Sequence, residues 1–147
     1  MKPTQEYRLP TDVEWSTAVG LPRESGSTPQ VRGGKIKGVY PWGTQWPPPR
    51  GAGNYAPELK VDDFVNTGPV GSFAANQFGL YDLGGNAWEW CEDFYASQIG
   101  GHVLRGAAWS HGIPELQLLS SFRLSGTPNL RRVVNGFRVV LASGPLR

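Results

Sequence analysis

The stretch NQFGLYDLGGNAWEWCEDFY, residues 76–95, decides the fold, and it is dense in aromatic side chains. Within it, Trp88-Glu89-Trp90-Cys91 alternates in the way that is typical of a strand with one buried face. The Gly-Gly-Asn turn before this strand lies between two carboxylates, Asp82 and Glu89, and its backbone carbonyls are free to point inward. The stretch therefore predicts a half-buried strand beside an oxygen-rich turn.

A helix is predicted on the N-terminal side of this stretch, within residues 7–20. Thr11 and Glu14 have the spacing of a capping box, in which each side chain accepts from the backbone N–H of the other. Gly20 is expected to end the helix in a left-handed conformation. The apolar face of the helix is expected to contain Val13, Trp15, Ala18 and Val19.

Three further strands are predicted, at Val70–Phe73, His102–Gly106 and Gly136–Leu141. The connection Ala107–Asn135 shows little periodicity, and long irregular connections in compact domains are usually functional. The chain has 147 residues with 20 glycines and 13 prolines, which are too many for a helical bundle. We therefore expect one loop-rich α+β domain over residues 1–147, with a core large enough to need no disulfides.

Charge and cysteine content exclude several classes of protein. Fourteen basic and twelve acidic residues give a net charge of +2, without a basic cluster beyond Arg131-Arg132, so a nucleic-acid partner is not expected. No apolar run reaches membrane-spanning length and the N-terminus has no signal-peptide core, so we expect no membrane partner and a cytoplasmic protein. The single cysteine, Cys91, excludes an internal disulfide framework and any two-cysteine redox or zinc motif.

Several phrases along the chain together resemble the formylglycine-generating, sulfatase-modifying factor family, whose domain is a variant of the C-type lectin fold. They are Tyr7–Trp15, Tyr40–Gly43, Pro69–Phe73, Asn76–Trp90, Val103–Gly106 and Gly136–Arg138. The resemblance spans nearly the whole chain but lacks the usual N-terminal portion of the family. It implies a C-type-lectin-like α+β domain that is either a compact member or a fragment.

The resemblance also implies calcium, which takes six to eight oxygen ligands from carboxylates, carbonyls and water. The ligands implied are Asp82, Gly85, Ala87 and Glu89 at a first site, and Asn54, Tyr55, Asp62 and Phe64 at a second. The alternative for the first site is that Asp82 only forms a turn and Glu89 is a surface strand residue. At the second site, Asp63 is an alternative to Asp62.

The resemblance further implies an enzyme that oxidises a substrate cysteine, using two active-site cysteines that bind copper. Those cysteines would fall near His111 and near Glu115 or Leu116, where this sequence has none. Cys91, within the predicted strand, is more typical of a small buried apolar residue. We therefore expect no copper and no catalytic residues. A formylglycine-generating oxidase or a related thiol-modifying enzyme remains the alternative.

The block from Arg105 to Arg138 also resembles the C-type-lectin-like variable proteins of diversity-generating retroelements, in which scattered positions change through adenines in Asn codons. Ala107-Ala108 departs from the Gly-Ser of both groups of relatives. The resemblance implies a non-catalytic domain with a variable surface that binds an unknown protein or small-molecule ligand. The implied positions are all residue types that an AAC codon can reach: Ser110, His111, Gly112, Leu116, Phe122, Leu124, Ser125, Gly126, Leu130, Arg132, Val133 and Val134.

Exposed apolar residues grouped with Arg and His are typical of a recognition patch. The alternative is that the apolar residues of this segment fill the core beneath a long loop. Arg123 and Arg138 are expected to be structural and to pair with carboxylates such as Glu92 or Asp93. Phe137 is expected to belong to the core.

Overall fold

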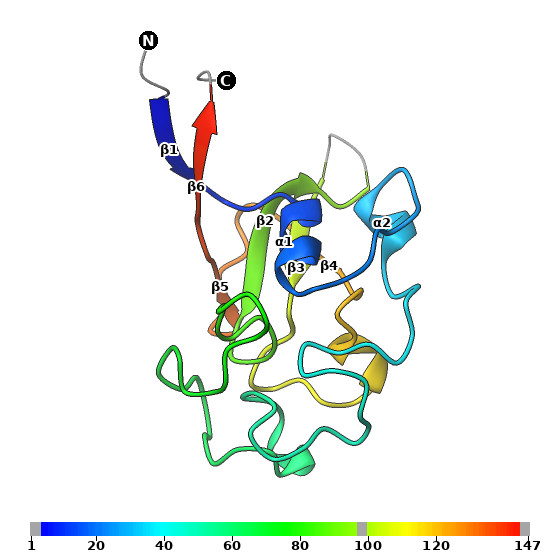
Figure 1. The fold of residues 1–147 in the computed structure, drawn as a ribbon, viewed down its shortest axis with the longest axis vertical. Helices are drawn as coiled ribbons and strands as arrows, with labels where there is room; N and C mark the ends of the chain where they lie inside the picture. The colour runs from blue at the N-terminus through cyan, green and yellow to red at the C-terminus, as the bar shows by residue number, and fades with distance from the viewer. Residues whose placement is uncertain (1–3, 97–99, 145–147) are drawn as a thin grey trace.

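Two sheets organise the computed structural model, which describes residues 4–96 and 100–144 (Figure 1). The larger sheet has the strand order β4-β3-β2-β5, and its strands are antiparallel except for β5, which runs parallel to β2. The smaller sheet is an antiparallel ribbon of β1 and β6, the first and last strands. The strands are β1 (Thr4–Arg8), β2 (Trp88–Phe94), β3 (His102–Arg105), β4 (Leu124–Gly126), β5 (Asn135–Gly136) and β6 (Val140–Gly144).

The predicted helix is present as α1, Asp12–Ala18, and its capping box is confirmed. Thr11 Oγ1 accepts from the Glu14 N–H at 3.2 Å, and Glu14 Oε2 accepts from the Thr11 N–H at 2.8 Å. Gly20 is left-handed with φ 85°, as expected. The helix is shorter than predicted because residues 7 and 8 pair with β6 instead. Val13 lies outside the apolar face and is exposed, whereas Trp15 is buried.

The remaining helical segments are short: α2 (Pro29–Arg32), η1 (Pro57–Leu59) and η2 (Glu115–Leu118). In the ranges that the structure describes, no helix has the length and apolarity needed to cross a bilayer.

Two strand predictions are wrong. Residues 70–73 form a turn, because Gly71 adopts a left-handed φ of 75° that a strand cannot accommodate. The predicted strand over 136–141 is divided between the two sheets. Gly136 pairs with Glu89 of β2, and Val140 pairs with Arg8 of β1, so the chain passes from one sheet to the other between them.

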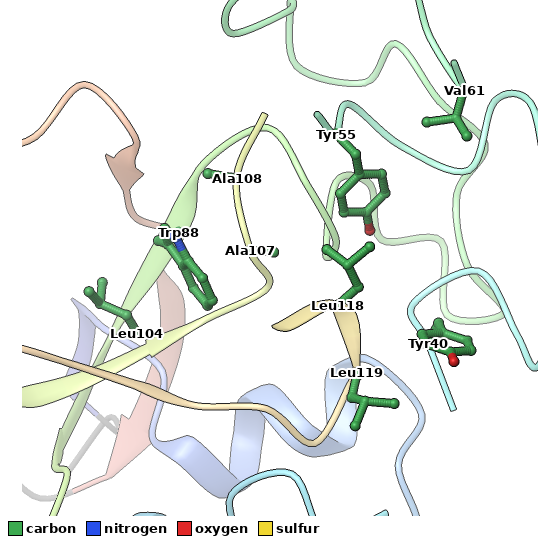
Figure 2. Close-up of a cluster of buried hydrophobic side chains, with 9 residues drawn as sticks. All are labelled: Tyr40, Tyr55, Val61, Trp88, Leu104, Ala107, Ala108, Leu118 and Leu119. Carbon is green, nitrogen blue, oxygen red and sulfur yellow. The ribbon is translucent and has the colours of Figure 1, made fainter. Parts of the chain in front are cut away.

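The core lies on both faces of β2 and β3, which confirms the positions of the two strands predicted there. The expectation that β2 has only one buried face is wrong, because Trp88, Glu89 and Cys91 are all buried. Val103 and Leu104, both fully buried, follow each other along β3 and belong to different apolar clusters because successive strand residues point to opposite faces. The first cluster (Figure 2) contains Tyr40, Tyr55, Val61, Trp88, Leu104, Ala107, Ala108, Leu118 and Leu119. The second contains Trp15, Val19, Leu21, Leu83, Cys91 and Val103.

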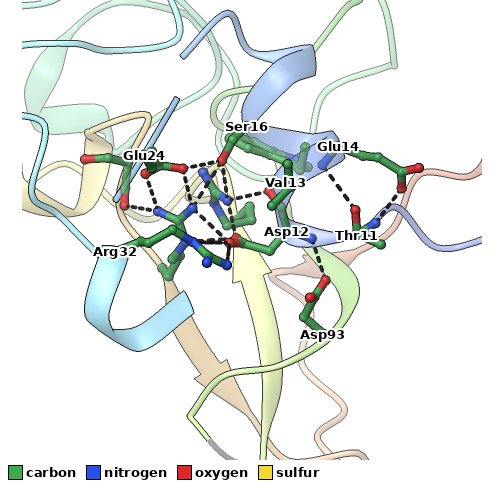
Figure 3. A network of polar contacts seen from close by, with 12 residues as sticks. Thr11, Asp12, Val13, Glu14, Ser16, Glu24, Arg32 and Asp93 are labelled. Atoms are coloured by element: carbon green, nitrogen blue, oxygen red, sulfur yellow. Dashed lines mark hydrogen bonds and ion pairs between the residues drawn. The ribbon is translucent and has the colours of Figure 1, made fainter. Parts of the chain in front are cut away.

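A buried ionic network joins α1 to α2, to β3 and to the residue that precedes β4 (Figure 3). Asp12, with no exposed surface, accepts from Arg32 Nη2 at 2.8 Å and from Arg123 Nε at 2.8 Å, and it also pairs with the fully buried Arg105. Arg123 reaches Glu24 as well, at 2.6 Å. Arg123 is structural, as expected, but the predicted partners Glu92 and Asp93 are wrong.

Candidate functional site

The predicted binding segment, residues 107–135, is arranged around the buried Trp88 at the start of β2. The His111 ring meets the Trp88 ring edge-on at 5.2 Å between centroids, and the Phe122 ring lies 6.1 Å away on a tilted plane. The backbone N–H of Trp88 donates to the Val134 carbonyl at 2.8 Å. One buried indole therefore brings together three stretches of the segment that are distant in sequence.

The twelve predicted positions divide by exposure. Val133 has 83% of its surface exposed, Leu116 41% and Leu124 38%, so apolar side chains do reach solvent here. The exposed positions are Ser110, Leu116, Leu124, Ser125, Arg132 and Val133. The partly buried positions are His111, Phe122, Leu130 and Val134, and the last three pack against the first core cluster. The segment therefore contributes in part to the core, as the alternative predicted, and in part to the exposed surface.

Two predicted positions contribute nothing to an exposed surface. Gly112 and Gly126 are buried, contrary to the expectation. A Cβ at Gly126 would lie 2.5 Å from the Trp90 ring, and one at Gly112 would lie 3.0 Å from Ala56 and Leu59. Close packing therefore restricts residue 126 to glycine, whereas a side chain at residue 112 would require its neighbours to shift slightly.

The sequence analysis missed Ile113, which has 77% of its surface exposed beside His111. The signal was available, because Ile113 is a large apolar residue in a segment without helical or strand periodicity. It adds a fourth well-exposed apolar side chain to the segment that carries Leu116, Leu124 and Val133.

The described residues offer no nucleophile for thiol chemistry. Cys91 is fully buried in β2, and burial raises the pKa of its thiol. His111 Nε2 accepts from Trp88 Nε1 at 3.4 Å, and burial lowers the pKa of His111, which favours the neutral ring. Within residues 4–96 and 100–144, no three His, Cys, Asp or Glu side chains gather as a metal site.

The first implied calcium site has its main carboxylate engaged by an arginine. Glu89 accepts from Arg138 Nε at 2.6 Å and Nη2 at 2.5 Å, and from Trp15 Nε1 at 2.7 Å. Arg138 therefore pairs with Glu89, and not with the predicted Glu92 or Asp93. The Asp82 carboxylate accepts from the Gly71 N–H at 2.6 Å. Both carboxylates of the implied first site therefore already accept from protein donors, and calcium at Asp82, Gly85, Ala87 and Glu89 stays a prediction.

The second implied site has a donor set that fits calcium better. The amide Oδ1 of the fully buried Asn54 has no hydrogen-bond partner within the described residues, although its Nδ2 donates to the Asn66 carbonyl at 2.8 Å. The Asp62 carboxylate lies against the same loop, accepting from the Tyr55 N–H at 3.0 Å and from the Phe64 N–H at 2.9 Å. The structure thus places the Asp62 carboxylate against the backbone of Tyr55 and Phe64, and calcium at this site stays a prediction. An unpartnered buried oxygen such as Asn54 Oδ1 is costly unless something binds it.

The chain matches a known protein family over nearly its whole length. Residues 2–143 match the model of the sulfatase-modifying factor enzyme 1-like domain. The chain belongs to this family. The resemblance found in the sequence is therefore confirmed, and so is the predicted C-type-lectin-like, loop-rich α+β fold.

Relatives of this sulfatase-modifying factor domain include inactive and active proteins. It is 35% identical over 146 residues to the inactive C-alpha-formylglycine-generating enzyme 2 of Bos taurus, covering 93% of this chain and 44% of the relative. It is 36% identical over 98 residues to the formylglycine-generating enzyme of Thermomonospora curvata, covering 61% of this chain and 28% of the enzyme. The domain thus spans less than half the length of these relatives.

A similar solved structure is Treponema denticola variable protein 1, with a TM-score of 0.66 and 24% sequence identity. The match covers 90% of this chain and 46% of that protein. At this level of identity the likeness concerns the fold.

Proposed function

We propose that this domain binds a ligand without catalysis and that residues 107–135 carry its binding surface. The observation that carries the proposal is the exposure of large apolar side chains on this segment, above all Val133 at 83% and Ile113 at 77%. Apolar groups of this size rarely gather on a surface that contacts only water.

The scaffold beneath the surface is suited to this role. Trp88 is 2% exposed and holds His111, Phe122 and Val134 against the core, so the chain between them is anchored at several points. Exposed residues such as Val133 can then change without loss of the fold. Apolar side chains bordered by arginine, here Arg131 and Arg132, are a composition that protein interfaces favour.

The alternative, an oxidase acting on cysteine, lacks its chemical groups. The one thiol, on Cys91, is fully buried with a raised pKa, and a thiolate is the form that binds copper or attacks a substrate. Similarity to an inactive relative over 93% of the chain supports the same view. Copper and a cysteine-bearing sulfatase peptide should therefore leave the peptide mass unchanged. Conversion of the cysteine to formylglycine would overturn the non-catalytic proposal.

The binding surface is tested by substituting exposed positions together. A variant with Leu124→Asn, Ser125→Asn and Val133→Asn should keep a melting temperature within a few degrees of the parent, because surface changes usually alter stability by about 0.5 kcal/mol or less. The control Trp88→Ala should unfold the domain, since truncating a buried Trp costs about 3–5 kcal/mol. A partner selected from a peptide display library with the parent protein should not bind the triple variant. Unfolding of the triple variant, or full binding by it, would contradict the assignment.

We also propose calcium at the site formed by Asn54, Tyr55, Asp62 and Phe64. The unpartnered Asn54 Oδ1 and the adjacent Asp62 carboxylate support it, because calcium binds side-chain amide and carboxylate oxygens together with carbonyls. Bound calcium would fix the loop between residues 54 and 64 against the core and hold the scaffold rigid. Calcium at Asp82 and Glu89 would have to bind beside Arg138, which already donates twice to the Glu89 carboxylate.

A further inference from the structure

Residues 131–133 form a short exposed stretch that is anchored to the core at both ends. Leu130, just before it, and Val134, just after it, are partly buried and pack against the first core cluster. The Val134 carbonyl also accepts from the Trp88 N–H at 2.8 Å. The three side chains between these anchors all lie at the surface. The stretch is therefore displayed from two fixed points.

Val133 lies at a turn position where such a side chain is unusual. The Asn135 N–H donates to the Arg132 carbonyl at 3.1 Å, which makes Val133 the first central residue of a β-turn. Turns are rich in Gly, Pro, Asn, Asp and Ser, whereas Val133 is β-branched, apolar and 83% exposed. Its side chain stabilises neither the turn nor the core, and departures from local preference of this kind are typical of functional sites.

Arg131 and Arg132 differ from most arginines of the domain because they lack a protein partner. Arg131, Arg132 and Arg23 form no ion pair and no side-chain hydrogen bond within residues 4–96 and 100–144. The other six arginines of these ranges each pair with a carboxylate: Arg8, Arg32, Arg50, Arg105, Arg123 and Arg138. Two of the three unpaired guanidinium groups are thus adjacent in sequence and directly precede Val133.

The exposed charge of the binding segment, residues 107–135, is positive. Glu115 is the one acidic residue of the segment, and its carboxylate already accepts from the Tyr40 hydroxyl. Arg123 is buried in the ionic network, so the Arg131-Arg132 pair supplies the exposed guanidinium groups. A surface with a surplus of positive charge is complementary to a partner that presents carboxylates.

A protein partner is favoured over a nucleic acid at this stretch. No other two basic residues are adjacent in the chain, and its net charge is only +2. Sequence-independent binding to phosphates needs a wider basic surface. Val133 offers apolar surface next to the guanidinium groups, and protein interfaces are enriched in arginine beside apolar side chains.

We propose that Arg131, Arg132 and Val133 bind an acidic segment of a protein, in which carboxylates lie next to an apolar side chain. The inference rests on the proposed binding function of residues 107–135 and adds the chemistry of the partner. A guanidinium binds a carboxylate through two parallel N–H···O bonds. Because an exposed ion pair contributes little by itself, the apolar contact at Val133 has to exclude water from these bonds.

The first test selects a random peptide display library against the parent domain. Asp and Glu next to apolar residues should be enriched, and the Kd of a synthetic peptide with the most enriched sequence is then measured by calorimetry. Arg131→Glu and Arg132→Glu should each weaken binding by roughly tenfold or more. Arg23→Glu makes the same change at the third unpaired arginine and should leave the Kd unchanged. All three variants should keep the melting temperature of the parent, because the side chains are exposed.

The second test exchanges the charges. Lysines in place of the acidic residues of the peptide should abolish binding to the parent and restore binding to the double variant Arg131→Glu, Arg132→Glu. Selected peptides without acidic enrichment, or equal binding by the parent and both single variants, would overturn the acidic partner and leave the binding surface in place.

Two further outcomes separate the alternatives. A single-stranded DNA oligonucleotide that binds the parent more tightly than the peptide, and does not bind the Arg131→Glu or Arg132→Glu variant, would overturn the proposal in favour of a nucleic acid. A library that yields no binder, or binders that the triple variant at Leu124, Ser125 and Val133 retains, would instead contradict the proposed function.

Discussion

Replacing Asp12 by Asn should be among the most damaging single changes in this domain. Asp12 is fully buried and is contacted by the guanidinium groups of Arg32, Arg105 and Arg123. Among the described residues, the only other carboxylate that Arg123 reaches is Glu24. Asparagine keeps the shape of Asp12 but removes its charge, so the buried Arg105 and Arg123 would be left with Glu24 as the remaining carboxylate of the network.

The magnitude follows from the burial of these charges. Burial lowers the pKa of Arg105 to about 10 although Asp12 opposes it, which shows how unfavourable this interior is for a charge. Removing one partner of a buried ion pair costs about 3–5 kcal/mol because the other charge stays buried without compensation. For a domain of this size, 1 kcal/mol corresponds to about 2–4 °C, so the melting temperature should fall by roughly 6–20 °C.

The assay is urea unfolding followed by tryptophan fluorescence, with Asp63→Asn as the matched control. Asp63 pairs with Arg50, but the two side chains are 83% and 66% exposed, so its loss should cost about 0.5 kcal/mol or less. A loss below about 1 kcal/mol for Asp12→Asn would refute the reasoning, because it would mean that the network adds nothing to the stability that packing alone provides.

The pH dependence of this difference gives an independent check. Burial alone would raise the pKa of Asp12, but the Arg105 charge and hydrogen bonds from Arg123 and Arg32 outweigh it and hold the pKa below its ordinary 3.8. The stabilisation by a carboxylate with a lowered pKa is complete above the unfolded value and is lost as the pH falls through the folded value. The gap between the parent and Asp12→Asn should therefore be constant near pH 7 and shrink below pH 3.8.

Two further predictions concern calcium and the cysteine. Chelator should lower the melting temperature of the parent. The Asp62→Asn variant should lose this effect of chelator, whereas Asp63→Asn should keep it. Equal melting temperatures of the parent with and without chelator would rule out stabilising calcium. Cys91 should resist alkylation in the folded protein at pH 8 and react fully in denaturant, because its thiol is buried with a raised pKa. Rapid alkylation of the native protein, followed by mass spectrometry, would show that β2 opens and that the thiol is available.

Local patterns in the sequence were sufficient for several elements. The Thr11–Glu14 spacing located the start of α1, and the alternation at Trp88–Cys91 located β2, because capping and strand periodicity depend on neighbours in sequence. The same approach failed at Val70–Phe73, where apolar composition indicated a strand and the left-handed Gly71 made a turn. Composition alone does not fix the backbone at a glycine.

The candidate site stays a prediction as a binding segment, and only part of it is exposed as the sequence suggested. Its lack of periodicity pointed to residues 107–135, but burial of Gly112 and Gly126 depends on Trp90, Ala56 and Leu59, which come from other parts of the chain. Phe137 shows the opposite error, since its apolar side chain suggested the core and the structure leaves it 70% exposed. Which face of a strand is covered depends on what packs there, and a single strand does not carry that information.

The sequence by itself determined the family, the cap of α1, the strands β2 and β3, and the lack of a cysteine pair. Each of these depends on residue identities or on spacings of a few residues. The tertiary structure decided which charges meet. Asp12 and Arg123 are 111 residues apart in sequence and Glu89 and Arg138 are 49 apart. No local pattern encodes such pairs, because in the sequence any carboxylate could pair with any guanidinium. Folding removes water from one particular set of these charges, and those charges must then pair with each other.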